Sequence, residues 1–354
     1  MDLIELIKAL LIGIVEGVTE WLPISSTGHM ILFDEFVRLD VSPAFLEIFL
    51  VVIQLGAIMA VIILYFHRLN PFSPRKDRAE RRVTLGVWGR VLIGCIPAAI
   101  VGLLLDSWVE AHFYNAVVVA CALVLYGVAF ILVERVKRRD TPVVGRHARH
   151  ASRAAQEQSS VDDRERNTAR RAAPARRVAP ARRPAPTRRP APTRRAAPAR
   201  RAIDARQDDR SLPSVTDEVA TLSIPIVLGI GLFQCLAIIP GTSRSGSTIL
   251  GGLILGVSRT VAAEFSFFLA IPVMFGWSLL KIVKGFVLDG LSLTSTEWGV
   301  LVVGIVAAFG ISVLTIRLLV GYIKEHSFAA FGVYRIVLGL LLLGFFAFAG
   351  SAVL

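Results

Sequence analysis

Residues Glu16–Leu32 read EGVTEWLPISSTGHMIL, and residues Gln234–Leu250 read QCLAIIPGTSRSGSTIL. We call these stretches the first motif and the second motif. Each follows a short apolar stretch, turns at a proline, continues with Pro-x-(Ser/Thr)-Ser and a glycine, and closes on Ile-Leu. Interrupted apolar segments at matching positions of two halves indicate a binding site inside a membrane protein. Because the carboxylates come from the first motif and an arginine from the second, the two motifs are expected to share that site.

The composition places the chain among polytopic membrane proteins, with a mean hydropathy of +0.63 and 54% hydrophobic residues. The net charge of +12 is concentrated in residues 135–216, which hold 23 Arg and Lys against 8 Asp and Glu, so the rest of the chain carries about −3. The three cysteines stand singly in apolar runs, and neither a disulfide nor a zinc site is expected. Acidic residues precede the first apolar run, so the N-terminus is read as retained.

An all-α polytopic fold is predicted, because six stretches reach the roughly 20 apolar residues that span a bilayer. They are 45–66, 86–105, 115–134, 260–284, 298–318 and 328–350. Stretches 3–20 and 219–239 lead into the motifs, and short apolar pieces follow at 30–39 and 248–257. Each half, 1–134 and 217–354, is thus a re-entrant helix pair plus three transmembrane helices. Since three is odd, the second half begins on the opposite side, which predicts an inverted-topology repeat.

The orientation follows from the charged loops. The loop over 67–90 holds seven Arg and Lys, whereas 106–114 and 285–297 hold none. We therefore expect the basic loops, and residues 135–216, to be cytoplasmic in a bacterial plasma membrane, with the site opening outward.

Residues 135–216 repeat Arg pairs every six positions between Ala and Pro, which predicts an extended disordered linker. It is either a plain spacer or a tether to anionic inner-leaflet lipid. No specific nucleic-acid partner is expected, and the oligomeric state, a homodimer included, stays open.

The first motif offers a metal site. Glu16 and Glu20 are four residues apart and share one helix face. Two carboxylates at membrane depth repel each other unless a cation or proton compensates, and oxygen-only ligands suit Mg²⁺ or Ca²⁺. The alternative is an interfacial carboxylate pair that faces water.

Phosphate chemistry is suggested by the residues that follow. Ser26, Thr27 and His29 place hydroxyls and an imidazole at a helix start, which favours anions. His29 could act as nucleophile, acid or base. Arg244 offers a donor fork for phosphate oxygens, unless it only pairs with Glu16 or Glu20. The second-motif hydroxyls are either phosphate donors or helix caps and packing groups; they include Ser243, Ser245 and Thr248.

Four other polar residues near the spans are read as structural. Gln54 and Glu264 are expected to bond between helices, and Glu134 and Arg335 to snorkel at span ends.

At these residues the chain resembles the undecaprenyl-diphosphate phosphatase family, also called the bacitracin-resistance protein BacA family. The resemblance rests on Glu16-Gly-x-Thr-Glu20-x-Leu-Pro-x-Ser-Ser-Thr-Gly-His29 and on Pro240-Gly-x-Ser243-Arg244-Ser-Gly-x-Thr248. It covers 1–134 and 217–354 and departs at the 135–216 insertion. It implies that the C55 polyprenyl diphosphate is hydrolysed to its monophosphate, with a divalent metal, for cell-wall synthesis. It also implies metal or acid–base work for Glu16 and Glu20, with Ser26 and His29 at the reacting phosphate and Arg244 binding phosphate.

Two other classes of membrane protein share parts of this pattern. A secondary transporter or lipid flippase also uses inverted repeats and broken helices. The acid-phosphatase superfamily of lipid phosphatases would need a histidine six residues after Arg244, where Leu250 stands. We set the second class aside.

Overall fold

The computed structural model describes residues 2–34, 37–113, 115–140 and 215–349, and within them every regular element is helical. Contacts divide the chain into two units, Met1–Arg135 with Pro213–Leu354 and Val136–Leu212. The fold described below is that of the first unit. Residues 141–214, most of the predicted linker, lie outside the described residues.

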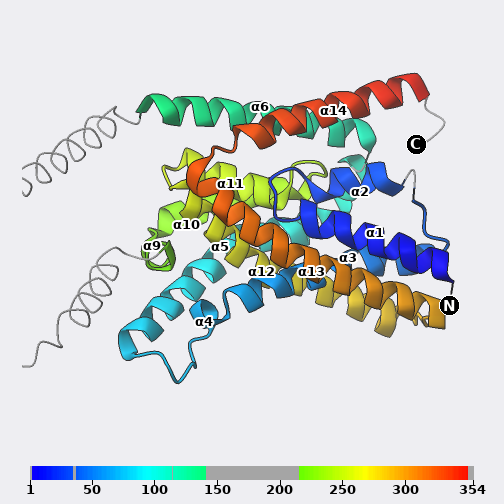
Figure 1. Ribbon diagram of the computed structural model, residues 1–354, viewed down its shortest axis with the longest axis horizontal. Helices are drawn as coiled ribbons and strands as arrows, with labels where there is room; N and C mark the ends of the chain where they lie inside the picture. The colour runs from blue at the N-terminus through cyan, green and yellow to red at the C-terminus, as the bar shows by residue number, and fades with distance from the viewer. Residues whose placement is uncertain (1, 35–36, 114, 141–214, 350–354) are drawn as a thin grey trace, which may run out of the picture. The chain divides into compact units, whose positions relative to one another are not determined.

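The first half of the chain contributes six described helices, shown in blue to green in Figure 1. They are α1 (Leu3–Thr19), α2 (Ser26–Asp34), α3 (Pro43–Leu64), α4 (Phe66–Leu69), α5 (Arg78–Phe113) and α6 (Ala116–Asp140). The second half contributes α9 (Val215–Thr221), α10 (Ile224–Cys235), η1 (Leu236–Ile238), α11 (Arg244–Ile254), α12 (Arg259–Val283), η2 (Lys284–Leu288), α13 (Ser295–Glu325) and α14 (Ala329–Ala349).

Among the described residues, six helices are long and apolar enough to cross a membrane, and they match the six predicted spans. They lie at Pro43–Leu64, Arg78–Leu105, Ala116–Lys137, Arg259–Leu288, Ser295–Glu325 and Ala329–Phe348. The chain is therefore a multi-pass membrane protein. The helices beside the motifs are shorter: α1 has 17 residues, α2 has 9 and α11 has 11. Helices α2 and α11 begin four residues before the apolar pieces predicted at 30–39 and 248–257, because the hydroxyl residues form their first turns.

Helix α12 forms the centre of the unit. Every residue from Val261 to Ile271 is buried, and the helix contacts α3, α5, α11 and α13. A helix that is apolar on all sides is expected to be enclosed by its neighbours. Ser258 caps its N-terminus by accepting a hydrogen bond from the Val261 amide.

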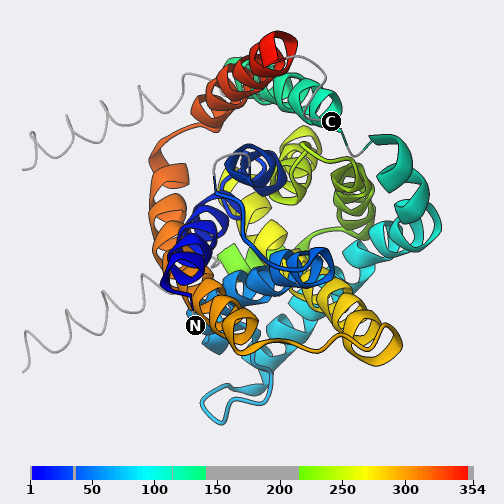
Figure 2. The ribbon, with the colours of Figure 1, turned by 90° about the vertical axis from the view of Figure 1, so that its right-hand side faces the viewer.

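Helix α1 packs against α13 with almost no side chain between them. A Cβ atom placed on Gly17 would lie 2.8 Å from the Ala308 carbonyl oxygen and 2.8 Å from Cβ of Ile311. Only glycine allows this approach, as is common where membrane helices meet. The end of α1, which carries the carboxylates, is thereby fixed on a long span; Figure 2 shows the two helices side by side.

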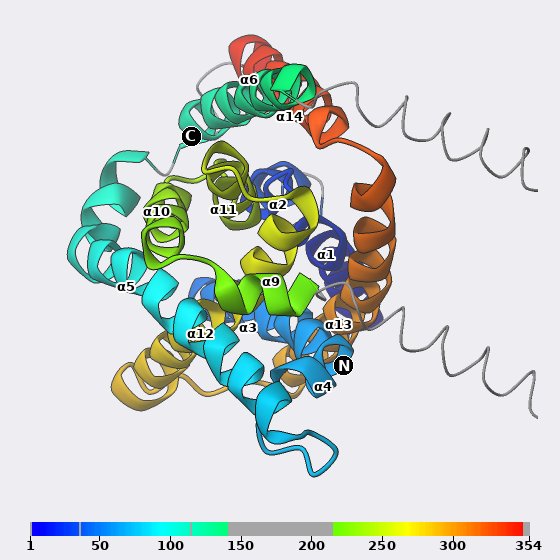
Figure 3. The ribbon, with the colours of Figure 1, turned by 90° about the vertical axis from the view of Figure 1, so that its left-hand side faces the viewer.

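Helices α6 and α14 lie together as a layer above α2 and α11, as Figures 1 and 3 show. Leu338 and Leu342 of α14 share a cluster with Val119, Ala120 and Leu123 of α6. Leu32 of α2 packs against the same cluster. The third span of each half thus covers the short helices that follow the motif turns.

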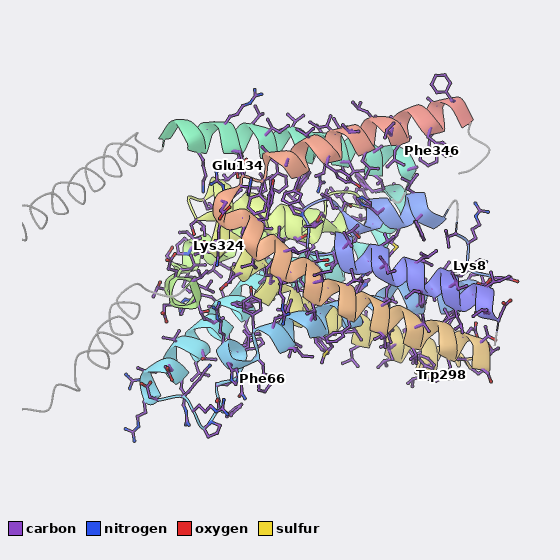
Figure 4. The ribbon with its side chains drawn as sticks, in the orientation of Figure 1. Lys8, Phe66, Glu134, Trp298, Lys324 and Phe346 are labelled. Carbon is purple, nitrogen blue, oxygen red and sulfur yellow. The ribbon has the colours of Figure 1, made fainter. Side chains whose placement is uncertain are left out.

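The prediction that Glu134 snorkels at a span end is wrong. Glu134 is 1% exposed and accepts a 2.9 Å hydrogen bond from Nε of Arg259 and a 3.1 Å bond from the Phe328 amide. It therefore ties α6 to the starts of α12 and α14. Figure 4 places Glu134 and Lys324 toward one end of the spans, and Lys8 and Trp298 toward the other. Glu264, read as structural, pairs with Arg68 of α4 at 2.9 Å.

Candidate active site

The two motif turns meet. Nη2 of Arg244 donates to Oε1 of Glu20 at 3.0 Å, across 224 residues of sequence. The Ser245 hydroxyl donates to the Glu20 carbonyl oxygen at 3.0 Å. The structure therefore brings the carboxylates of the first motif and the arginine of the second into one place, as the sequence predicted.

Each turn is built on a serine with a left-handed backbone. Ser25 has φ 75° and Ser243 has φ 69°, a region that L-residues other than glycine seldom adopt. Ser25 accepts a 3.3 Å bond from the Gly28 amide, and Ser243 a 3.1 Å bond from the Gly246 amide. Both serines thus cap the helix that begins at the next residue, and Ser26 and Arg244 occupy equivalent first positions of α2 and α11.

Glu20 is held on both carboxylate oxygens. Its Oε1 accepts from Arg244, and its Oε2 accepts from the Ser26 hydroxyl at 2.9 Å. The Arg244 guanidinium lies 5.9 Å from the ring centre of Trp21 and also donates to the Ser266 carbonyl oxygen at 3.0 Å. Trp21 is fully buried, so one face of the arginine is shielded by an aromatic ring.

Glu16 lies one helical turn before Glu20 and is 2% exposed. Its Oε1 has no hydrogen-bond partner among the described residues. A buried carboxylate oxygen without a partner is costly, so a cation or a proton is needed there. Within the described ranges no group of three or more His, Cys, Asp or Glu could enclose a metal. An ion at Glu16 and Glu20 would therefore need water or phosphate oxygens as further ligands, as Mg²⁺ accepts.

His29 is fixed at both ring nitrogens. Nδ1 lies 2.7 Å from the Ser25 carbonyl oxygen, and Nε2 lies 2.7 Å from the Tyr334 hydroxyl. The side chain is half-buried, as are those of Ser26 and Thr27. Tyr334 was not predicted from the sequence, because nothing in the pattern of α14 marks which residue meets the first motif.

Arg335 was predicted to snorkel, and this prediction is wrong. Its side chain is fully buried and donates to three carbonyl oxygens: Pro23 at 3.2 Å, Gly241 at 2.8 Å and Thr242 at 3.0 Å. The guanidinium therefore joins the turns of both motifs. An arginine inside an apolar span was the available signal, since such a group needs buried partners.

The Arg335 side chain and the second motif turn both pack against α6. The guanidinium lies 5.2 Å from the ring centre of Tyr126, whose hydroxyl receives a 3.1 Å bond from Ser247. Gly241, at φ +91°, packs so closely that a Cβ there would lie 2.6 Å from the Val119 carbonyl oxygen. The second motif turn is thus pressed on the backbone of α6.

The second-motif hydroxyls mostly bond within the protein. Ser243 caps α11, and Ser245 bonds the Glu20 backbone. Thr248 bonds the Arg244 carbonyl oxygen at 3.0 Å and the Ser266 hydroxyl at 2.6 Å. These contacts match the capping and packing alternative for Ser243 and Thr248. Their phosphate-binding role, like that of Thr27 and Ser245, stays a prediction.

Comparison with known proteins gives concordant results. The family described as "Bacitracin resistance protein BacA" matches residues 9–162 and 202–341. Curated proteins named undecaprenyl-diphosphatase are similar along nearly the whole chain. That of Enterococcus faecalis is 43% identical over 97% of this chain and 98% of its own. Those of Streptococcus thermophilus and Streptococcus pyogenes are 46% and 45% identical, over 96% and 98% of this chain and 93% and 99% of their own.

Proposed function

The chain belongs to the family described as bacitracin resistance protein BacA, and we propose that it hydrolyses undecaprenyl diphosphate to undecaprenyl phosphate and inorganic phosphate. The reaction recycles the lipid carrier for peptidoglycan synthesis and confers bacitracin resistance. The observation that carries the proposal is the Arg244–Glu20 contact, in which Glu20 also accepts from Ser26, with His29 three residues after Ser26 in α2. This contact supports the proposal, because a guanidinium beside carboxylates and a hydroxyl in a membrane-embedded chain suits a lipid-linked diphosphate.

We assign the phosphate clamp to Arg244. Its planar fork matches phosphate oxygens, and the N-termini of α2 and α11 add backbone donors. When a terminal phosphate binds, one arm of the guanidinium can stay on Glu20 while another turns to the substrate. Charge that develops on the transferring phosphoryl group is then stabilised by a donor already held in place.

His29 is the group we assign to attack. With Nδ1 carrying the hydrogen that faces the Ser25 carbonyl, the neutral ring has its lone pair on Nε2. Attack of Nε2 on the terminal phosphorus breaks the bond to the bridging oxygen, which leaves with undecaprenyl phosphate. Water then cleaves the phosphohistidine and releases inorganic phosphate. Ser26, whose hydroxyl donates to Glu20, is the alternative nucleophile, with Glu20 as its base.

A divalent ion, Mg²⁺ or Ca²⁺, is our proposed cofactor. Glu16 and Glu20 would hold it, and the unpaired buried Oε1 of Glu16 fits a cation. When bound, such an ion neutralises charge on the diphosphate and its leaving group.

The inverted-topology repeat is proposed for the whole membrane unit. It is supported by the equivalent capping turns at Ser25 and Ser243 and by the three spans that follow each short helix pair. In Figure 1, α1 and α2 lie toward the side of the unit where the N-terminus is marked, and α10 and α11 lie toward the opposite side. The basic 67–90 loop favours a cytoplasmic position for that loop, with the site opening outward from a bacterial plasma membrane.

Phosphate release from undecaprenyl diphosphate tests the function. Detergent-purified protein is assayed with Mg²⁺ or Ca²⁺ and then with chelator, beside Glu20→Ala. Metal-dependent release that is lost in Glu20→Ala supports both the reaction and the placement of the carboxylates. Protein that is folded and binds the lipid but releases no phosphate would instead favour a lipid transporter.

A further inference from the structure

A hydroxyl group of helix α14 reaches the histidine of the first motif. The Tyr334 hydroxyl oxygen lies 2.7 Å from Nε2 of His29, although 305 residues separate the two in sequence. The rings are parallel, with an interplanar angle of 0° and centres 5.6 Å apart.

The direction of the hydrogen bond follows from the other nitrogen. Nδ1 faces the Ser25 carbonyl oxygen, which can only accept, so Nδ1 carries a hydrogen. In the neutral imidazole Nε2 then has only a lone pair, and the Tyr334 hydroxyl donates to it. Tyr334 therefore binds the atom assigned above to attack phosphorus.

The bond to Ser25 does not hold the ring alone. It spans four residues within one helical turn, so it moves with α2 and lets the ring pivot about it. Tyr334 belongs to another layer. Its neighbour Arg335 is bonded to Pro23, Gly241 and Thr242 of the two motif turns. The position of the Tyr334 hydroxyl is therefore fixed relative to both motif turns. Through its bond to Nε2, the hydroxyl fixes the His29 ring relative to the same turns.

We propose that Tyr334 is the positioning residue of His29, whose hydroxyl holds Nε2 toward the place that the terminal phosphate takes. This inference rests on the proposed function. Tyr334 is 45% exposed, so its hydroxyl can withdraw when phosphate arrives. Its contribution is to the fraction of enzyme molecules whose ring already faces the substrate, since a competent state that is less populated turns over more slowly.

The matched substitution is Tyr334→Phe, which keeps the ring and removes only the hydroxyl. Tyr322 provides the control, because it stacks on His326 at 4.5 Å outside the motif turns, and Tyr322→Phe removes a hydroxyl beside a histidine there. Tyr334→Phe is expected to lower kcat about 10-fold with KM within about twofold, as for loss of orientation rather than of binding. Tyr322→Phe is expected to leave both unchanged.

A double substitution separates positioning from packing. In the His29→Ala background, Tyr334→Phe should cause no further loss of residual turnover, because a residue that acts through His29 has nothing left to position. A further loss equal to that in the wild-type background would overturn the proposal, as would an unchanged or raised kcat in Tyr334→Phe.

Carbethoxylation of His29 by diethyl pyrocarbonate, followed by mass spectrometry, tests the contact without turnover. Tyr334→Phe should react at His29 several-fold faster than wild type, whereas Tyr322→Phe should not. Equal rates in the three proteins would overturn the proposal. Because this measurement needs no substrate, a protein that fails to hydrolyse the lipid would refute the function and leave the contact separately tested.

Discussion

Ser25 and Ser243 have positive φ angles that cost about 1–3 kcal/mol each for a residue with a Cβ. The strain is retained because three carbonyls beside the two serines are bound by Arg335, and both serines cap a helix. The result is that Ser26 and Arg244 each stand at a helix start, where backbone amides favour anions, and both side chains bond Glu20. The site is preorganised at the expense of local conformational energy.

We predict that His29→Ala and Arg244→Ala each lower phosphate release at least 100-fold, because one loses the proposed nucleophile and the other the phosphate fork. The measurement is turnover of undecaprenyl diphosphate by purified protein. Both variants should insert into the membrane and elute as wild type on size exclusion. Near-normal turnover in either variant would remove that residue from the mechanism.

Arg335→Gln is predicted to destabilise the protein by about 2–4 kcal/mol, because several buried carbonyls lose a charged donor. Arg335→Lys should recover only part of this, since one ammonium cannot reach carbonyls in both turns as the fork does. The readout is the apparent Tm in detergent. The control is Arg317→Gln on the exposed side of α13, which should leave the Tm unchanged. An Arg335→Gln protein as stable as wild type would mean that the turns hold without the guanidinium.

The hydropathy of the chain was sufficient to predict the six spans, because a bilayer-length apolar run leaves few alternatives. The pairing of Glu20 with Arg244 was also predictable, since each needs an opposite charge at membrane depth. Hydropathy does not say which residues of two spans face each other. Tyr334 was therefore missed, and Arg335 and Glu134 were misread, although each contacts a part of the chain that is distant in sequence.

The close packing of α1 on α13 gives a prediction for helix contacts. Gly17→Ala should lower stability by about 1–3 kcal/mol, because the new Cβ would overlap the Ala308 carbonyl oxygen and Ile311. It should also lower turnover, since the preceding residue is Glu16. Gly310→Ala, on α13 with nothing within 4 Å of the added Cβ, is the matched control and should be neutral or slightly stabilising. Thermal unfolding in detergent would measure both, and equal effects would contradict the close approach.

The membrane unit and the basic insertion divide the charge of the chain between them. Residues 135–216 hold most of the Arg and Lys, while the rest is slightly acidic and supplies every residue of the candidate site. The family match covers 9–162 and 202–341 and leaves out 163–201, the part with the repeated Arg pairs. What the site requires is therefore contained in the part of the chain that the family shares.

Deletion of residues 163–201 is accordingly predicted to leave turnover in detergent within about twofold of wild type, because the cost of joining two segments depends only weakly on the length of the connection between them. The same deletion should weaken adhesion of the linker to vesicles that contain anionic lipid, at roughly 1 kcal/mol for each basic residue near the surface. A peptide of residues 163–201, assayed on anionic and on neutral vesicles at low and high salt, measures that adhesion directly.

A variant in which six Arg pairs become Gln pairs keeps the length and removes the charge. Loss of turnover in the deletion but not in the Gln variant would show that the length of the linker matters to the membrane unit. Loss of turnover in both variants would show that the basic residues contribute to turnover. The prediction that the membrane unit alone is sufficient would then be wrong.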